Sequence, residues 1–140
     1  VHNVERHLTE TGDKWAKRRA GTFDRVLVDA PCTGAGTWRR NPDARLRLRE
    51  IDLAELRPKQ VAILDTAQTM VKAGGRLIYA TCSLLPDENE NQIAAFLERH
   101  PDFRIAPLPE SLPHDGDFLS LTPARHGTDG FFAAVLERAA

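Results

Sequence analysis

The stretch "DRVLVDAPCTGAG", residues 24–36, passes from a short apolar run directly into an acid, a proline, a cysteine and two glycines. Three contiguous apolar residues, rich in β-branched side chains, are typical of a strand that is covered on both faces. The pattern returns at "RLIYATCS", residues 76–83, where a second apolar run ends in Cys82. The chain has two cysteines, Cys32 and Cys82, and each follows directly on a predicted strand.

The residues between these strands favour a loop and a helix. Residues 31–57 are interrupted by prolines and glycines, so we expect a long loop with a short helical piece after Asn41, and such loops are often functional. "RPKQVAILDTAQTMVKAGG", residues 57–75, predicts a helix because its apolar side chains recur at helical spacing. Pro58 suits the first turn of this helix, and Gly74-Gly75 would end it.

The C-terminal half predicts one more helix and two more strands. Acidic side chains open "PDENENQIAAFLERHP", residues 86–101, and basic side chains close it, which suits the helix dipole. We expect a short strand at 103–108 and a last strand at 129–138, with mostly loop in 102–124, while residues 1–8 are a weaker strand candidate. Strands that alternate with helices predict an α/β fold with a largely parallel sheet. Ligands gather at the carboxyl ends of parallel strands, which is where both cysteines are expected.

Composition limits the class of protein. The chain of 140 residues is long enough for one domain, residues 1–140, and its 41% hydrophobic and 28% charged residues are ordinary for a globular protein. No apolar run is long enough to cross a bilayer and no leader opens the chain, so we expect a cytoplasmic protein with reduced thiols. Residues 1–60 hold 13 Lys and Arg against 9 Asp and Glu, whereas the remainder holds 6 against 11. This asymmetry is compatible with a phosphate-facing side, although a solvated helical face is the simpler explanation.

Several kinds of chemistry could use the two thiols. Neither cysteine has a second Cys or a His close enough in sequence for a zinc site, and neither has the arginine six residues on that a phosphatase loop needs, so no metal is expected. A regulatory disulfide would require the two strands to be neighbours. In covalent catalysis, a thiolate adds to an electron-poor carbon such as C6 of a pyrimidine, an acid binds the N3 edge, and a second thiol removes the C5 proton. Two buried core cysteines are the structural alternative, and the residues alone leave it open.

Taken together, several motifs resemble those of a known family. "DAPCTGAG", residues 29–36, and "YATCS", residues 79–83, are similar to the paired cysteine motifs of the Fmu/Sun family of RNA (cytosine-5) methyltransferases. "NPD" at 41–43, "GGRLIYATCSLLPDENE" at 74–90 and "HGTDGFF" at 126–132 resemble that family in the same order. The resemblance implies the Rossmann-like α/β fold of S-adenosylmethionine-dependent methyltransferases. It also implies transfer of a methyl group to C5 of a cytosine in RNA, either ribosomal or transfer RNA.

The resemblance assigns roles to individual residues. Cys82 would attack C6 of the cytosine, Cys32 would act in resolving the covalent adduct, and Asp29 would contact the target base. Asp29, with Pro31 beside it, would also lie near the methyl donor, and Asp13 would lie near the adenine end of the cofactor. DNA cytosine-5 enzymes use the thiol that follows the proline as nucleophile, so attack by Cys32 is the alternative assignment.

A base inside a helix is out of reach of a thiol, so the target cytosine must be single-stranded or flipped. Trp38, Arg39 and Arg40 could supply stacking and phosphate contacts beside the pocket. A hydrophobic plug under the loop is the alternative for Trp38. We expect His126 to be a turn or packing residue rather than a base.

The glycine-rich cofactor loop of the family does not occur in this sequence. We therefore expect the chain to be the C-terminal part of a methyltransferase domain, which by itself binds S-adenosylmethionine weakly or not at all and is inactive. We expect self-association or a partner to cover the sheet edge that the absent strands would pair. A non-catalytic RNA-binding module and a thiol redox protein are the competing functions.

Overall fold

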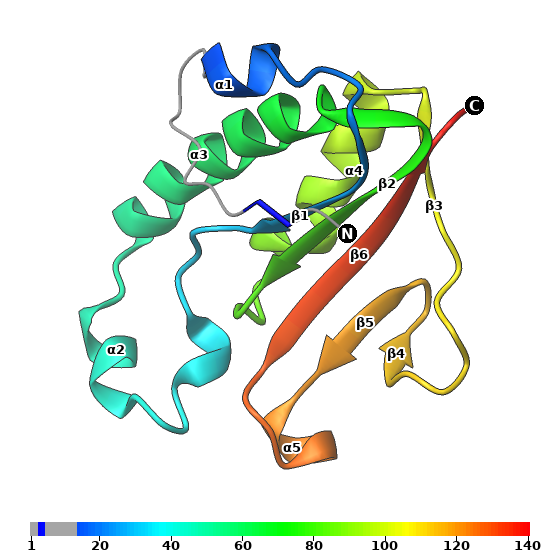
Figure 1. Ribbon diagram of the computed structural model, residues 1–140. Coiled ribbons are helices and arrows are strands. Elements are labelled where there is room, and N and C mark those ends of the chain that lie inside the picture. Colours follow the sequence, from blue (N-terminus) through cyan, green and yellow to red (C-terminus); the bar gives the residue numbers. More distant parts are fainter. Residues whose placement is uncertain (1–2, 5–13) are drawn as a thin grey trace.

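One mixed sheet carries both cysteine motifs, in a computed structural model that describes residues 3–4 and 14–140 (Figure 1). Asp13 and most of the strand expected at 1–8 lie outside the described residues. The elements, with η for a 3-10 helix, are α1 (Lys14–Lys17), β1 (Phe23–Asp29), η1 (Ala35–Thr37), α2 (Pro42–Arg47), α3 (Glu50–Gln68), β2 (Val71–Thr81), η2 (Pro86–Glu88), α4 (Glu90–Arg99), β3 (Phe103–Ile105), β4 (His114–Asp115), β5 (Phe118–Leu121), α5 (Pro123–His126) and β6 (Phe131–Arg138).

The sheet has the strand order β1-β2-β6-β5-β4, and β3 also pairs with β6. β1 and β2 run parallel, with Asp29 opposite Ala80. The other pairings among the described residues are antiparallel, so the prediction of a largely parallel sheet is wrong. The reason is that the chain turns at α5, beyond the carboxyl end of β2, and then re-enters the sheet as β6 in the opposite direction (Figure 1).

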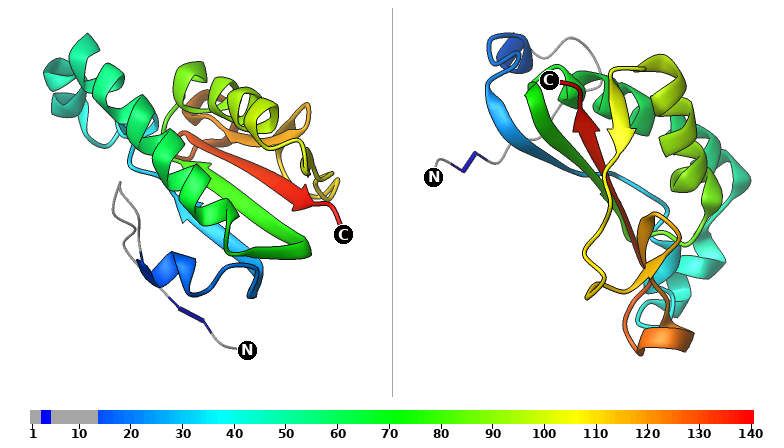
Figure 2. Two further views of the ribbon diagram at one scale, coloured as in Figure 1. Left: turned by 90° about the horizontal axis from the view of Figure 1, so that it is seen from above. Right: turned by 90° about the vertical axis from the view of Figure 1, so that its right-hand side faces the viewer.

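Helices α3 and α4 cover the same face of the sheet (Figure 2). Burial alternates along β6, as expected for a strand with one covered face. The opposite face is open at β1, where Leu27 is 68% exposed. The core between helices and sheet includes Leu64, Ala67, Leu77, Tyr79, Ile93, Phe96, Phe132, Ala134 and Leu136.

Helix α3 differs from its prediction at both ends. It begins at Glu50, where the Asp52 carboxylate accepts a hydrogen bond from the Arg49 N–H at 2.8 Å and caps the first turn. Pro58 therefore lies inside the helix rather than in its first turn, and the packed face of α3 compensates for the backbone bond lost there. The helix ends at Gln68, and Gly74-Gly75 lie within β2 instead, next to an irregular stretch of the pairing with β1. Gly74 has a φ of +72°, which a side chain would disfavour.

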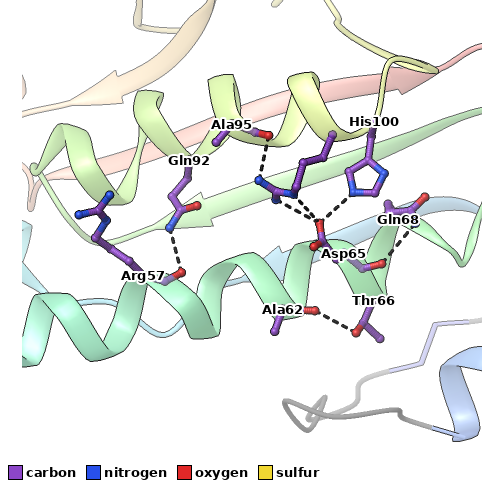
Figure 3. Close-up of polar contacts among 9 residues, drawn as sticks. Arg57, Ala62, Asp65, Thr66, Gln68, Gln92, Ala95 and His100 are labelled. Carbon is purple, nitrogen blue, oxygen red and sulfur yellow. Dashed lines mark hydrogen bonds and ion pairs between the residues drawn. The ribbon is translucent and has the colours of Figure 1, made fainter.

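Side chains at both ends of α4 attach it to α3 (Figure 3). The Asp65 carboxylate lies 3.1 Å from Arg99 Nη2 and 2.8 Å from His100 Nε2. Near the start of α4, Gln92 Nε2 donates to the Arg57 carbonyl at 3.1 Å. These contacts fix the position of α4, and with it that of η2, which directly precedes α4 and ends at Glu88.

The predictions for the C-terminal half are confirmed in part. The structure confirms the helix as η2 and α4, the short strand as β3, the last strand as β6, and the helical piece after Asn41 as α2. It adds β4, β5 and α5 within a segment expected to be mostly loop, where prolines interrupt any periodic pattern. Within the described residues, no helix combines the length and apolar character needed to cross a membrane.

Candidate active site

Cys32 and Cys82 meet at the carboxyl ends of β1 and β2. Both thiols are free and half-buried, and their Sγ atoms lie 3.4 Å apart. The parallel register causes this, because Asp29 pairs with Ala80 and each cysteine follows a few residues later in the chain. The expectation that the two strand ends gather at one edge is therefore confirmed. The condition for a disulfide, that the strands are neighbours, is also met.

Burial, followed by the hydrogen bond with Cys82, raises the pKa of the Cys32 thiol to about 12. An unperturbed thiol has a pKa of about 8.5. Cys32 is therefore protonated at neutral pH. Either sulfur can donate in this contact, so it is compatible with attack by Cys82 and with attack by Cys32.

Glu88 joins the Cys32 loop to the segment that follows Cys82. Its side chain is fully buried, and its carboxylate accepts hydrogen bonds from the Thr33 N–H at 2.9 Å and from Thr33 Oγ1 at 2.7 Å. Gln60 Nε2 donates to the same carboxylate at 3.1 Å and to the Pro31 carbonyl at 2.9 Å. A buried carboxylate is costly unless its oxygens accept hydrogen bonds, so Glu88 holds this loop in one position.

A second layer of buried groups supports Glu88. Gln92 Nε2 donates to Gln60 Oε1 at 3.1 Å and thereby orients the Gln60 amide. The Tyr79 hydroxyl donates to the Glu88 carbonyl at 2.7 Å. Burial and the nearby Glu88 charge raise the pKa of Tyr79, so the phenol remains a donor. The orientation of Glu88 is thus set by α3, α4 and β2 together.

The segment after Cys82 is held by its own side chains. Thr81 Oγ1 donates to Asn89 Oδ1, and Asn89 Nδ2 donates to the Ser83 carbonyl at 2.9 Å. Ser83 Oγ accepts a hydrogen bond from the Leu85 N–H at 3.0 Å. Cys82 therefore projects from a backbone that is fixed on both sides of it.

The third motif, "HGTDGFF", closes against the first. The Gly36 N–H donates to the Cys82 carbonyl at 2.9 Å, and the Gly130 N–H donates to the Gly36 carbonyl at 2.7 Å. Arg40 Nε also forms an ion pair of 2.7 Å with Asp129 Oδ2. Three segments that are far apart in the sequence thus meet around the thiols.

Asp29 and Pro31 lie at the rim beside Cys32, and both are exposed. The Asp29 carboxylate makes no hydrogen bond or ion pair with any residue in 3–4 and 14–140, so it is available as an acceptor. A free carboxylate fits the amino and hydroxyl groups of S-adenosylmethionine and equally the exocyclic amino group of a cytosine. The Pro31 carbonyl is already occupied by Gln60. In the part of the chain that the structure describes, no group of three or more His, Cys, Asp or Glu side chains could hold a metal ion.

The residues expected to contact RNA lie on the segment after η1. Arg39 is exposed, whereas the guanidinium of Arg40 is engaged with Asp129. The Trp38 ring is half-buried, and its Nε1 is buried without a hydrogen-bond partner among the described residues. The guanidinium of Arg45 lies 5.9 Å from the centre of this ring. The buried Nε1 and the contact with Arg45 indicate that part of the Trp38 indole packs beneath the loop, as the alternative of a hydrophobic plug predicts.

Sequence reasoning missed the residues that position the thiols. Glu88 and Asn89 lie inside the motif that carries the resemblance, so that motif could have indicated them. Gln60 gave no signal, because it is a polar residue within a helix that was recognised by its apolar spacing. His126 is the last residue of α5, where its Nδ1 accepts a hydrogen bond from the Thr122 N–H at 3.0 Å.

The raised pKa of Cys32 predicts an unusual alkylation profile. Only the thiolate reacts with iodoacetamide, so the alkylation rate at Cys32 should rise about tenfold per pH unit from pH 8 to beyond pH 10. In urea-unfolded chain the rate should level off near pH 9. Mass spectrometry of the Cys32 peptide measures both profiles, with circular dichroism to confirm folding at each pH. A plateau below pH 9 in the folded protein would contradict the raised pKa.

Gly36→Ala should separate the Cys32 loop from its neighbours. A Cβ at Gly36 would lie 2.3 Å from the Gly130 carbonyl oxygen and 2.8 Å from that of Cys82, which backbone atoms cannot accommodate. We expect solvent to enter and alkylation of Cys32 at pH 8 to accelerate by about tenfold or more. Gly116→Ala is the control, because its Cβ would meet no atom within 4 Å, and the backbone strain that its φ of +58° imposes lies in the exposed turn between β4 and β5. Equal alkylation rates in the two variants would show that this contact does not hold the site.

With this geometry in view, the similarity of the chain to known proteins becomes informative. The family model described as 16S rRNA methyltransferase RsmB/F matches residues 4–137. A probable ribosomal RNA small subunit methyltransferase B from Synechocystis is 41% identical over 141 residues, which cover 96% of this chain and 31% of that protein. The ribosomal RNA small subunit methyltransferase B of Salmonella arizonae is 48% identical over 114 residues, which cover 81% of this chain and 26% of that protein.

A solved structure gives the same result. NSun6 from Pyrococcus horikoshii, crystallised with SFG, superposes with a TM-score of 0.72 at 25% identity, covering 82% of this chain and 30% of that one. The chain thus spans about a third or less of the relatives that it matches. The expected resemblance and the Rossmann-like methyltransferase fold are confirmed, and the chain belongs to the RsmB/F family of 16S rRNA methyltransferases.

Proposed function

We propose that this chain carries the thiol centre of an enzyme that transfers a methyl group from S-adenosylmethionine to C5 of a cytosine in ribosomal RNA. The observation that carries the proposal is the 3.4 Å separation of Cys32 Sγ and Cys82 Sγ at the sheet rim, beside a free carboxylate. Two thiols at this distance can reach neighbouring atoms of one pyrimidine ring. The names of the relatives support the class of reaction and the RNA substrate.

In this proposal Cys82 attacks C6 of the cytosine and forms a covalent adduct, which makes C5 electron-rich. S-adenosylmethionine supplies the methyl group that C5 receives. The C5 proton then leaves, and expulsion of Cys82 Sγ restores the aromatic ring. We assign this release step to Cys32. After losing its own proton to solvent, Cys32 Sγ accepts the C5 proton, and the electrons of that C–H bond restore the ring and expel Cys82 Sγ as a thiolate.

The free carboxylate of Asp29 is proposed to bind the target base, the methyl donor, or both. Use of S-adenosylmethionine is supported by the relative whose structure contains SFG, an analogue of that cofactor. Asp13 and Pro31 remain predicted cofactor contacts, and Trp38, Arg39 and Arg40 remain predicted RNA contacts. The cytoplasm remains the predicted location.

Two other functions are compatible with part of this geometry. A thiol redox protein is favoured by one specific observation, since two free thiols at 3.4 Å are close enough to form a disulfide after a small movement. An RNA-binding module without chemistry would retain the exposed arginines and leave the thiols idle. Attack by Cys32 instead of Cys82 would use the same site with the roles exchanged.

Covalent trapping separates these possibilities. We expect the full-length protein that contains this chain to form a covalent adduct with a 16S ribosomal RNA transcript carrying 5-azacytidine, in the presence of S-adenosylmethionine. Cys82→Ser should abolish the adduct, because it removes the attacking sulfur. With unmodified transcript, Cys32→Ser should accumulate adduct, because release is blocked while attack still occurs. Denaturing gel electrophoresis with labelled RNA measures both.

The outcomes of this experiment are distinct. If Cys32→Ser abolishes the adduct and Cys82→Ser accumulates it, the roles are exchanged. Retention of RNA without any adduct would indicate a binding module. A Cys32–Cys82 disulfide that forms and is reduced during turnover of a thiol substrate, again without adduct, would indicate a redox protein.

The free edge of β1 is proposed to pair with a second copy or with a partner. Within the described residues β1 pairs with β2 alone, and Leu27 at its open face is 68% exposed. We expect the 140-residue chain by itself to self-associate in light scattering, and Leu27→Lys to weaken that association. Leu46→Lys is the matched control, since Leu46 is 85% exposed but lies on α2. A monodisperse monomer of the unsubstituted chain would contradict the proposal.

A further inference from the structure

Residues 38–49, which we name the arginine arm, form a surface element whose helix is almost uncovered by the rest of the chain. The arm contains α2, a helix of six residues with no buried residue, and Leu46 on it is 85% exposed. So short a helix is not stable without contacts elsewhere. In Figure 1 the arm projects beyond the carboxyl end of β1, away from the sheet.

Both ends of the arm are attached to the structure that holds the thiols. Arg40 pairs with Asp129 at 2.7 Å, and Arg49 Nη2 pairs with Asp52 Oδ1 at 2.8 Å at the start of α3. The arm begins just after Gly36, whose N–H donates to the Cys82 carbonyl. The arm is therefore held next to the catalytic loops although its middle is exposed.

The charge of the arm is strongly one-sided. It holds five arginines and one acidic residue, Asp43. Arg40 and Arg49 serve the two attachments, and Arg45 lies over the Trp38 ring. Arg47 on α2 is exposed and forms no ion pair with any residue that the structure describes. No acidic side chain in the described part of the chain forms an ion pair with Arg45 or Arg47, so a polyanion is the complement of the surface of α2.

We propose that the exposed surface of α2, through Arg45 and Arg47, binds the phosphate backbone of the RNA strand that flanks the target cytosine. The inference rests on the proposed function, because a strand that brings a base to the thiols must continue across the neighbouring surface. The arginines neutralise phosphates, and Leu46 between them packs against a ribose or a base. Such contacts position the strand and do not read its sequence.

The test compares two pairs of neutral substitutions in the full-length protein. Arg45→Gln/Arg47→Gln removes two charges from the arm while keeping polar side chains of similar helix propensity. Lys17→Gln/Arg18→Gln removes two exposed charges at α1, which lies near the opposite end of β1 (Figure 1). The probe is an unmodified single-stranded segment of 16S ribosomal RNA, and its affinity is measured between 50 and 300 mM KCl.

We expect the arm variant to bind roughly tenfold more weakly at low salt, with a log–log salt slope shallower by about 1.4, which is 0.7 for each lost phosphate contact. The α1 variant should retain both the affinity and the slope of the unsubstituted protein. An unchanged slope in the arm variant, or an equal loss in both variants, would overturn the inference.

Covalent trapping keeps this result separate from the proposed function. At saturating RNA carrying 5-azacytidine, the arm variant should reach the same final adduct yield as the unsubstituted protein, because neither arginine contacts a thiol. Loss of adduct at saturation would mean that α2 supports the site itself and would overturn the role in backbone binding. Absence of adduct in the unsubstituted protein would instead contradict the proposed function, whatever the salt dependence.

Discussion

The buried carboxylate of Glu88 is the constraint on which the site depends. It accepts two hydrogen bonds from Thr33 and one from Gln60, so it links the loop that carries Cys32 to α3 and to η2. If these bonds were broken, a fully buried carboxylate would lose its donors, which costs more than the loss of a hydrogen bond at the surface. The convergence of the two thiols therefore follows from the interior of the protein and not from the loops alone.

The sheet and the loops contribute differently to this arrangement. Parallel pairing of β1 with β2 places Asp29 opposite Ala80 and brings the two motifs to one edge. The close contact of Gly36 with Gly130 then adds the third motif, because any side chain at Gly36 would overlap the Gly130 carbonyl. Asp29 and the arginine arm stay exposed around this fixed centre, where a cofactor and an RNA strand could approach. Two thiols that are held in position beside exposed residues suit covalent chemistry on a base that a bound RNA strand presents to them.

The sequence allowed the strands β1, β2 and β6, the helix α4 and the pairing of the thiols to be predicted, because apolar runs and motif order are local signals. It could not show that β6 returns antiparallel, since strand direction depends on where the chain re-enters the sheet. Nor could it show that α3 continues through Pro58, which packing and the Asp52 cap permit. Gln60 escaped notice because a buried polar residue in a helix becomes meaningful only when its partners are known.

Binding of phenylarsine oxide tests the central claim most directly, because a single arsenic atom can bond two thiols only when they are close together. The account predicts that the folded protein binds one phenylarsenic group with loss of both Cys32 and Cys82 as free thiols. The Cys32→Ser and Cys82→Ser variants should each bind it weakly and reversibly. Independent reaction of the two thiols in the folded protein, with no bridged species in native mass spectrometry, would contradict the account.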